Sequence, residues 1–406
     1  MRQSIETAYL IAGFAMTTDT RLPSRFCNLA EARDRFGDRV DRIGPYLLAG
    51  DPLADAAVAA LAEMPGRGNS VVDAALRPDS SGAETPPALR AVIDSAALVP
   101  PWVEWDRIER GGRFFLRTGI FGGIVLGARA LILGYASPAG NKPLALSGRL
   151  RESAAPRLQE TARFVQAVVR PGGMRPGGEG FRITLRVRLM HAQVRRMILA
   201  SDRWNTAAWG LPINQHDMVA TCLLFSVITL EGLRLCGVDI SQRESDDFMH
   251  LWRFVSHVIG VDPALVPVTE SDGQRLGELI AATQGPADDD SRALTAALLD
   301  SGLSHPDDRE RRRAQSTRGI AHAVCRKMLG DELADQLGVK KPKERFLVAA
   351  AAATVKAIER ARPRVARMDD WLVEQGGRYW DEVLKKGLVY ATTDFHLPER
   401  LAAQPA

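Results

Sequence analysis

Helical spacing of apolar residues constrains the fold of this 406-residue chain more than any other feature. Long alanine- and leucine-rich segments place apolar residues three and four positions apart, whereas the alternation of β-branched residues typical of strands is scarce. Residues with that spacing share one face of a helix, so we predict an all-α protein. The expected helices cover residues 28–43, 51–63, 87–97, 104–117, 153–169, 182–201, 216–236, 244–259, 271–283, 290–302, 317–336 and 344–361.

A single large helical domain is the simplest organisation, because we find no internal repeat and no sharp break in composition. We expect an N-terminal extension (1–27), a helical domain (28–377) and a C-terminal tail (378–406), with loops at 65–87 and 284–291 and a short strand at 390–395. Ser153 and Asn214 are suited to cap helices, and the glycines between 172 and 178 favour a turn between two helices.

Composition excludes several classes of protein. The hydrophobic share of 46% and charged share of 25% are those of an ordinary globular chain, and the net charge is only +4. The four cysteines form no CxxC pair, which argues against a disulfide framework or a zinc site. No apolar run reaches the ~20 residues of a stable membrane span, and the first residues lack a basic signal-peptide region, so we expect a cytoplasmic protein. The basic runs at 309–313 and 340–343 lack interleaved aromatics, and we expect no nucleic-acid partner.

His191 is the main candidate for a metal ligand. It lies within residues 186–196 and shares a helical face with Arg188, Arg195 and several apolar residues. A neutral imidazole on an apolar wall suits the proximal ligand of a haem iron, and the arginines suit the haem propionates or a buried Asp. The alternative is a hydrogen-bonded packing histidine. His250 and His257 lie two turns apart, too far to chelate one metal without a third element.

The sequence around His191 resembles the latex clearing protein and rubber oxygenase family, whose catalytic domain is shared with fungal ER-bound oxygenases. The resemblance covers most of the chain. It is carried, in order, by Gly50–Asp55, Gly148–Leu150, Arg157 with Thr161, Arg188–Arg195, Trp209–Gln215, Trp252–Arg253 and Gly260–Asp262.

This resemblance implies a haem b protein with a globin-like helical core that cleaves carbon–carbon double bonds of polyisoprene with dioxygen. It makes His191 the proximal iron ligand, with Arg188 and Arg195 holding its helix or the haem edge. Arg157 and Thr161 become the distal pair that stabilises bound oxygen. From the residues alone, Arg157 and Thr161 share one helical face with Phe164 and Val168, so a guanidinium and a hydroxyl lie on an apolar wall.

The chain departs from the family pattern at two positions. Glu160 stands where the family often carries a lysine, and the region around Asn141 lacks the family's upstream carboxylate, since no Asp or Glu occurs between Glu109 and Glu152. If an allylic proton must be removed, Glu160 is the nearby candidate base. The alternatives are a haem oxidase or peroxidase of other specificity, a non-catalytic haem sensor, and a haem-free helical binding protein. Without export, the substrate is expected to be a smaller terpenoid or lipid rather than rubber.

Overall fold

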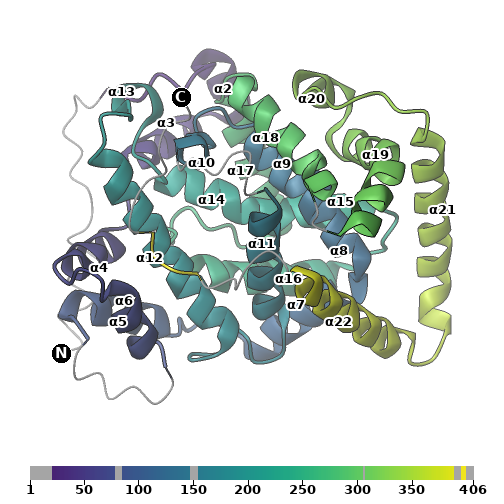
Figure 1. Ribbon diagram of the computed structural model, residues 1–406, viewed down its shortest axis with the longest axis horizontal. Coiled ribbons are helices and arrows are strands. Elements are labelled where there is room, and N and C mark those ends of the chain that lie inside the picture. The colour runs from purple at the N-terminus through teal and green to yellow at the C-terminus, as the bar shows by residue number, and fades with distance from the viewer. Residues whose placement is uncertain (1–20, 78–84, 147–153, 305–306, 388–394, 399–406) are drawn as a thin grey trace.

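The structure, a computed structural model, describes residues 21–77, 85–146, 154–304, 307–387 and 395–398, and within these ranges it contains helices and no strand. Figure 1 shows their arrangement. The first half of the chain forms α2 (Leu29–Phe36), α3 (Arg39–Ile43), η1 (Gly44–Leu48), α4 (Pro52–Ala62), α5 (Gly68–Ala75), α6 (Pro87–Ala97), α7 (Trp105–Thr118), α8 (Ile120–Val125), η2 (Leu126–Ala130), α9 (Leu131–Tyr135), α10 (Lys142–Leu146), α11 (Ala154–Val169) and α12 (Glu179–Leu199). The second half forms α13 (Thr206–Trp209), α14 (Gln215–Phe225), α15 (Val227–Leu235), α16 (Gln242–Val258), α17 (Glu270–Ala282), α18 (Asp289–Leu299), η3 (Ser301–Ser304), α19 (Asp308–Leu329), α20 (Asp331–Gln336), α21 (Arg345–Ala361), η4 (Arg362–Arg364) and α22 (Met368–Gly387).

Close backbone approaches hold the central helices together. α7 packs along α16 and also contacts α11, and its paired glycines permit both approaches. A Cβ at Gly111 would lie 2.5 Å from the carbonyl oxygen of Asp247 in α16, and a Cβ at Gly112 would overlap the carbonyl of Val169 in α11. The two glycines therefore bring three helices closer than larger residues would allow.

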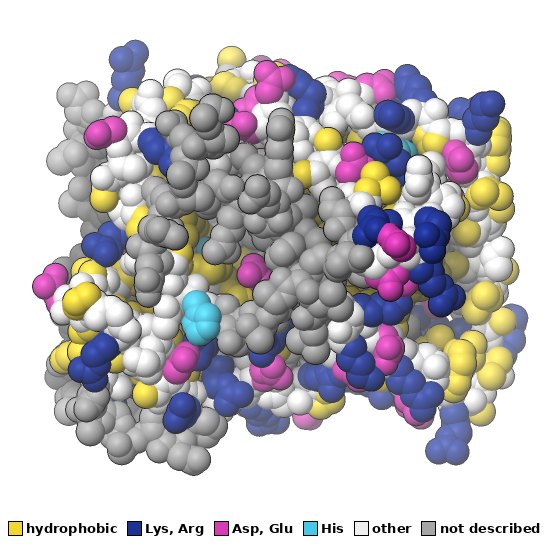
Figure 2. Space-filling model, in the orientation of Figure 1, with side chains coloured by type: hydrophobic (Ala, Val, Ile, Leu, Met, Phe, Trp, Pro, Cys, Tyr) yellow, Lys and Arg dark blue, Asp and Glu magenta, His cyan; other side chains and the backbone are white. Residues whose placement is uncertain are grey.

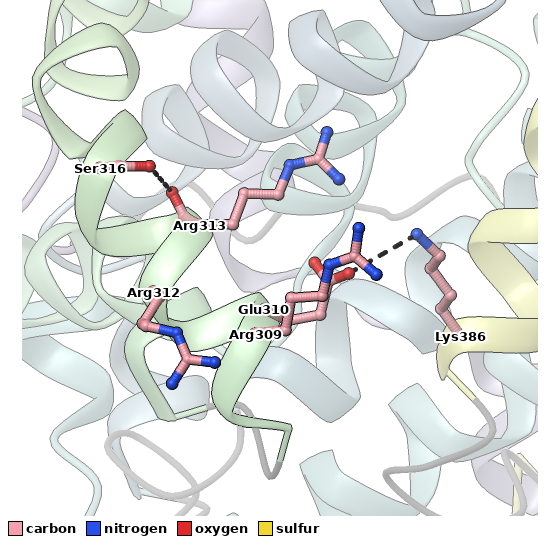
Figure 3. Close-up of a pocket in the computed structure, with 6 residues that line it drawn as sticks. All are labelled: Arg309, Glu310, Arg312, Arg313, Ser316 and Lys386. Atoms are coloured by element: carbon pink, nitrogen blue, oxygen red, sulfur yellow. Dashed lines mark hydrogen bonds and ion pairs between the residues drawn. The ribbon is translucent and has the colours of Figure 1, made fainter.

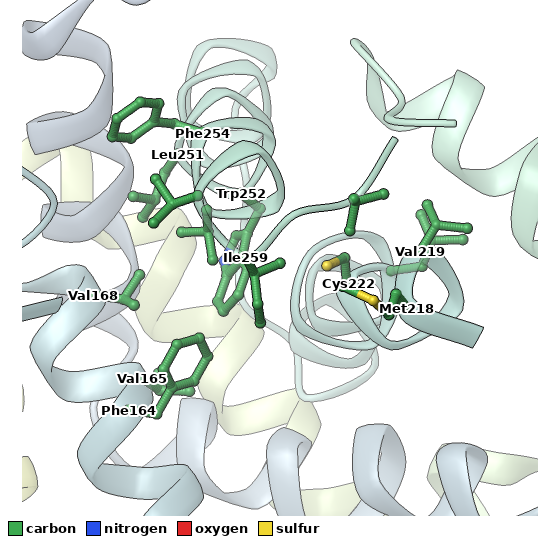
Figure 4. Close-up of a cluster of buried hydrophobic side chains, with 14 of the residues drawn as sticks. Phe164, Val165, Val168, Met218, Val219, Cys222, Leu251, Trp252, Phe254 and Ile259 are labelled. Atoms are coloured by element: carbon green, nitrogen blue, oxygen red, sulfur yellow. The ribbon is translucent and has the colours of Figure 1, made fainter. Parts of the chain in front are cut away.

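Aromatic and aliphatic side chains from α11, α14 and α16 fill the core between these helices (Figure 4). Trp252 of α16 stacks on Phe225 at 5.1 Å between ring centroids, and Phe164 of α11 meets Trp252 edge-on at 6.1 Å. Both arrangements are favourable for aromatic pairs. The cluster forms an apolar interior between α11 and its neighbours, so the face of α11 that carries Phe164 lies against apolar side chains.

The helices α11 and α12 are antiparallel neighbours joined by a glycine-rich turn, as the sequence predicts. At this turn a Cβ on Gly180 would lie 2.6 Å from the carbonyl oxygen of Ala167, so the two helices touch there. In Figure 1 they diverge with distance from the turn. The C-terminal helices α19 to α22 lie on the opposite side of α11 from α12 and α4, where α22 packs against α7.

The all-α prediction is confirmed, and several boundaries differ. The expected helix 28–43 ends at Gly37, whose φ of 64° breaks it into α2 and α3. The expected helix 216–236 divides at Ser226 into α14 and α15. The expected loop 65–87 contains α5, and α22 runs across the expected domain boundary at 377/378. Residues 390–394 of the expected strand, and Ser153, lie outside the described residues.

One described stretch, Gln215–Leu235, is long and apolar enough to cross a membrane, yet more than half of it is buried inside the molecule. The helices α14 and α15 within it supply much of the core, which accounts for their apolar composition. Cys222 and Cys236 are buried thiols as expected, and burial raises the pKa of each to about 11.

Candidate functional site

His191 lies near the middle of α12, which packs against α4, α11 and α16. Its neighbours Leu189 and Ala192 are fully buried, and the imidazole is largely enclosed. Burial, and after it the positive charge of Arg195, lower the pKa of His191 from 6.5 to about 4. Its Nδ1 atom is buried and has no hydrogen-bond partner. The ring is therefore neutral at pH 7, and it is not a hydrogen-bonded packing histidine at that atom.

Arg195 lies one helical turn after His191, and its side chain is only 3% exposed. All three of its guanidinium nitrogens are buried without a hydrogen-bond partner. The carboxylate nearest to it in an ion pair is Asp55, whose Oδ1 lies 3.5 Å from Nε, beyond a normal hydrogen bond. Burial lowers the pKa of Arg195 and raises that of Asp55. Because buried guanidinium donors without acceptors are costly, these nitrogens form a prepared site for an anion.

Arg188, on the same helix, has a different environment. Its Nε and Nη2 donate to the two carboxylate oxygens of Asp51 at 2.6 and 3.0 Å, and both side chains are buried. Asp51 also caps α4 by accepting a hydrogen bond from the backbone N–H of Ala54 at 3.2 Å. Of the two partners expected for Arg188, the structure therefore shows the buried Asp, and this pair fixes α4 against α12.

The residues expected on the opposite side come from α11. Thr161 and Glu160 are partly buried one turn before Phe164, which belongs to the core cluster of Figure 4. The backbone of Arg157 is helical, whereas its side chain lies outside the described part of the structure. The fold therefore brings the α11 positions and His191 onto neighbouring helices, and the apolar wall expected behind Thr161 is present.

Asn141 is buried and holds two segments together. Its side-chain N–H₂ donates to the carbonyl of Tyr135 at 2.8 Å and to the Ser291 hydroxyl at 3.0 Å. An amide has no basic carboxylate, so the residue that stands near the family's upstream acid is a structural connection here. Because the region around Asn141 lacks an acid, Glu160, which precedes Thr161 directly, stays the candidate carboxylate base.

Trp252 is one of the residues that carry the family resemblance, but its position in the sequence does not place it near Phe164 and Phe225. Its Nε1–H is buried in the core without a hydrogen-bond partner, while its ring stacks on Phe225. Buried Trp N–H groups usually find an acceptor. Only the long-range packing of α16 against α11 and α14 makes this visible, and no local sequence signal would have found it.

Other histidines differ from His191 in having one hydrogen-bonded or ion-paired ring nitrogen, although His216, His257 and His322 also each bury an Nε2 without a partner. His250 accepts a hydrogen bond from the backbone N–H of Glu104 at 3.0 Å and meets Trp102 edge-on. His216 contacts the Asp217 carboxylate at 3.4 Å, and that carboxylate also accepts two hydrogen bonds from Arg25 at 2.8 Å. Within the described ranges no three His, Cys, Asp or Glu side chains are grouped closely enough to hold a metal ion.

A surface hollow lies between α19 and α22, and neither His191 nor Arg195 lines it. It has a volume of about 690 Å³ and is bordered by arginines of α19 and by Lys386 of α22, with the carboxylate of Glu310 between them (Figure 3). Its lining is charged and contains no histidine and no apolar wall. It is therefore a different feature from the His191–Arg195 site.

Comparisons with known proteins identify the family and the fold of the chain. The family model for the catalytic domain of the ER-bound oxygenase mpaB/B′ and rubber oxygenase matches residues 115–357, which include Thr161, His191 and Arg195. The rubber oxygenase of Streptomyces sp. (strain K30) is 25% identical over 275 residues, covering 66% of this chain and 64% of that protein. The closed-state structure of latex clearing protein superimposes with a TM-score of 0.63 at 23% identity, covering 84% of this chain and 91% of that one, and shows the same fold. This chain belongs to the mpaB/rubber oxygenase catalytic-domain family.

Proposed function

We propose that the protein is a haem b-dependent oxygenase that cleaves carbon–carbon double bonds of an apolar, isoprenoid-like substrate with dioxygen. Family membership and the rubber oxygenase relative support the reaction class. One observation carries the proposal. The neutral ring of His191, whose buried Nδ1 has no hydrogen-bond partner, lies one helical turn from the buried guanidinium of Arg195, which makes no hydrogen bond. Polyisoprene or a smaller terpenoid or lipid is the proposed substrate.

The residues present fit a haem. A neutral histidine can hold the iron of a b-type haem, and cationic side chains can pair with its propionates. His191 would hold the iron, because burial keeps its ring neutral. Arg195 would hold a propionate, because its donors are unpaired. Arg188 would hold the helix rather than the haem, since Asp51 occupies its donors. When bound, the haem supplies the chemistry that activates dioxygen.

The side chains of α11 would supply the rest of the site. Thr161 offers a hydroxyl that can donate a hydrogen bond, and we assign Arg157 to the same side from its position four residues earlier. Phe164 and Trp252 form an apolar wall that would exclude water and orient an apolar alkene. Glu160 would accept the allylic proton, because the amide of Asn141 cannot.

A haem oxidase or peroxidase of other specificity is the second candidate. It is favoured by one observation: the buried amide of Asn141 stands where relatives are expected to carry a carboxylate base. A Glu160→Gln variant separates the two. Under the first proposal, oxygen uptake with an isoprenoid alkene falls at least tenfold while haem content is unchanged, since a positioned base contributes about 10²–10⁴ in rate. Unchanged uptake would support the second.

The primary test is the absorption spectrum of protein purified from haem-replete cells, beside His191→Ala and a control, His250→Ala. His250 is also a buried neutral histidine, but its ring accepts a backbone hydrogen bond. We expect a Soret band in the wild type and in the control, and none in His191→Ala. A wild type without the band would remove the oxygenase proposal and favour a haem-free binding protein. A wild type with the band but no alkene turnover would favour a haem sensor.

A further inference from the structure

The helix α21 (Arg345–Ala361) stands at the edge of the molecule, next to α19 (Figure 1). Its inner face is fixed to the body. Glu359 is buried and accepts hydrogen bonds from Arg117 at 2.9 and 3.1 Å. The backbone of Ala352 lies so close to Gly237 that a Cβ on Gly237 would overlap the Ala352 carbonyl oxygen. The orientation of α21 is therefore set by its buried side, and its other side faces outward.

That outward side is apolar. Phe346 is 70% exposed, Leu347 60% and Ile358 50%. Exposed alanines at 350, 353 and 357 follow Phe346 at spacings of three and four, which places them on the same side of the helix. Figure 2 shows apolar side chains along this edge of the molecule. Monomeric proteins rarely leave so many large apolar side chains together in water, so this surface is expected to have a partner.

Positive charge surrounds the apolar side. Residues 345–367 contain six Arg and Lys residues and one acid, and that acid is the buried Glu359. Lys356 and Arg360 are exposed beside the apolar side, and Arg364 and Arg367 are exposed in the turn that follows. In the same turn Val365 is 52% exposed. The basic segment 340–343 leads into the helix. Exposed acids border the segment only outside it, at Asp335, which pairs with Lys341, and at Asp369 and Asp370. An apolar helical face bordered by cations, with no exposed acid between residues 345 and 367, suits an anionic membrane surface.

We propose that α21 binds the surface of a membrane containing anionic lipids, with its apolar side in the acyl boundary and its cations at the headgroups. A second copy of the chain fits less well. A two-fold contact places the same patch on itself, and here that would set cations against cations with no acid between them. The proposal does not depend on the haem or on the oxygenase activity. It differs from a membrane span, because α21 stays attached to the body through Arg117 and Gly237.

Sedimentation of the full-length protein with vesicles tests the proposal. Phosphatidylcholine vesicles with and without about one-third phosphatidylglycerol are compared at low and high salt. We expect binding to the anionic vesicles only, weakened by salt. Lys356→Gln/Arg360→Gln should lower the partition coefficient about 25-fold, at about fivefold for each cation. Phe346→Ser/Leu347→Ser should abolish binding. Controls of matched exposure elsewhere, Leu98→Ser (60% exposed) and Arg39→Gln, should bind as wild type does.

Three results would overturn it. The first is no binding of the wild type to anionic vesicles. The second is equal binding by the Phe346→Ser/Leu347→Ser variant, whose fold is verified by circular dichroism. The third is a dimer in analytical ultracentrifugation that this variant converts to monomer, since a second copy would then cover α21.

Discussion

Replacement of Arg195 by methionine should stabilise the haem-free protein and weaken its affinity for haem. Methionine replaces the aliphatic stem of arginine without its guanidinium, so the packing of the stem is largely retained. What is lost is a buried positive charge whose three nitrogens make no hydrogen bond. The variant therefore measures whether this charge serves the fold or a bound anion.

The magnitude follows from the surroundings of Arg195. A buried polar group without a partner costs about 1–3 kcal/mol, and a charged one costs more. Against this stands the attraction of Asp55 at 3.5 Å, a carboxylate with 39% of its side chain exposed, which is worth less than about 1 kcal/mol. We expect Arg195→Met to raise the unfolding free energy of the haem-free chain by about 1–2 kcal/mol. Loss of a charge-assisted bond to a propionate should weaken haem binding by about 1.5–3 kcal/mol, roughly 10- to 150-fold.

Urea unfolding of the haem-free protein and a haem titration followed by absorption measure the two effects separately. The reasoning is refuted if Arg195→Met lowers the unfolding free energy of the haem-free chain by more than about 1 kcal/mol. That result would mean that Asp55 or the fold already satisfies the guanidinium. Unchanged haem affinity would remove Arg195 from the haem site.

Three further predictions concern stability. Arg188→Met should lower the unfolding free energy by about 3–5 kcal/mol with or without haem, measured in urea, because it leaves the buried Asp51 carboxylate unpaired. Burial depresses the pKa of His191 from 6.5 in the unfolded chain to about 4 in the folded chain. The unfolded chain therefore binds a proton at His191 first, and the unfolding free energy, which this group leaves unchanged above pH 6.5, falls as the pH is lowered toward 4. Urea unfolding at stepped pH should show a loss of about 3 kcal/mol that is absent in His191→Gln. Gly376→Ala should destabilise by about 1–3 kcal/mol, because its Cβ would overlap a backbone carbonyl of α7, whereas Gly377→Ala, with open space, should be neutral or stabilising in the same thermal melts.

Local sequence signals predicted the elements that local interactions determine. Asn214 caps α14 by accepting the backbone N–H of Asp217 at 2.9 Å, as its position suggested. The glycine-rich turn between α11 and α12 was equally visible. By contrast, the glycine-interrupted stretch 120–136 forms α8, η2 and α9, because burial against α14 and α15 outweighs its low helix propensity. The break at Ser226 likewise follows from packing, and no proline or glycine marks it.

Position along α12 could not distinguish the two arginines that flank His191. Arg188 and Arg195 lie on the same helical face in a similar apolar context. The difference between them depends on residues 137 and 140 positions earlier in the chain, where Asp51 precedes α4 and Asp55 follows one turn later. Such long-range contacts are set by packing, which the local pattern does not contain.

The helix α4 presents one carboxylate to each arginine, and the two contacts divide the face of α12 into a structural part and a candidate site. Asp51, as the cap residue, is buried and meets Arg188 with both oxygens. Asp55 remains partly in water and reaches Arg195 only at 3.5 Å. Because Arg188 already ties α12 to the start of α4 through Asp51, Arg195 need not be satisfied by the fold. A buried cation that the fold tolerates but does not need is best explained by an anion that binds beside His191.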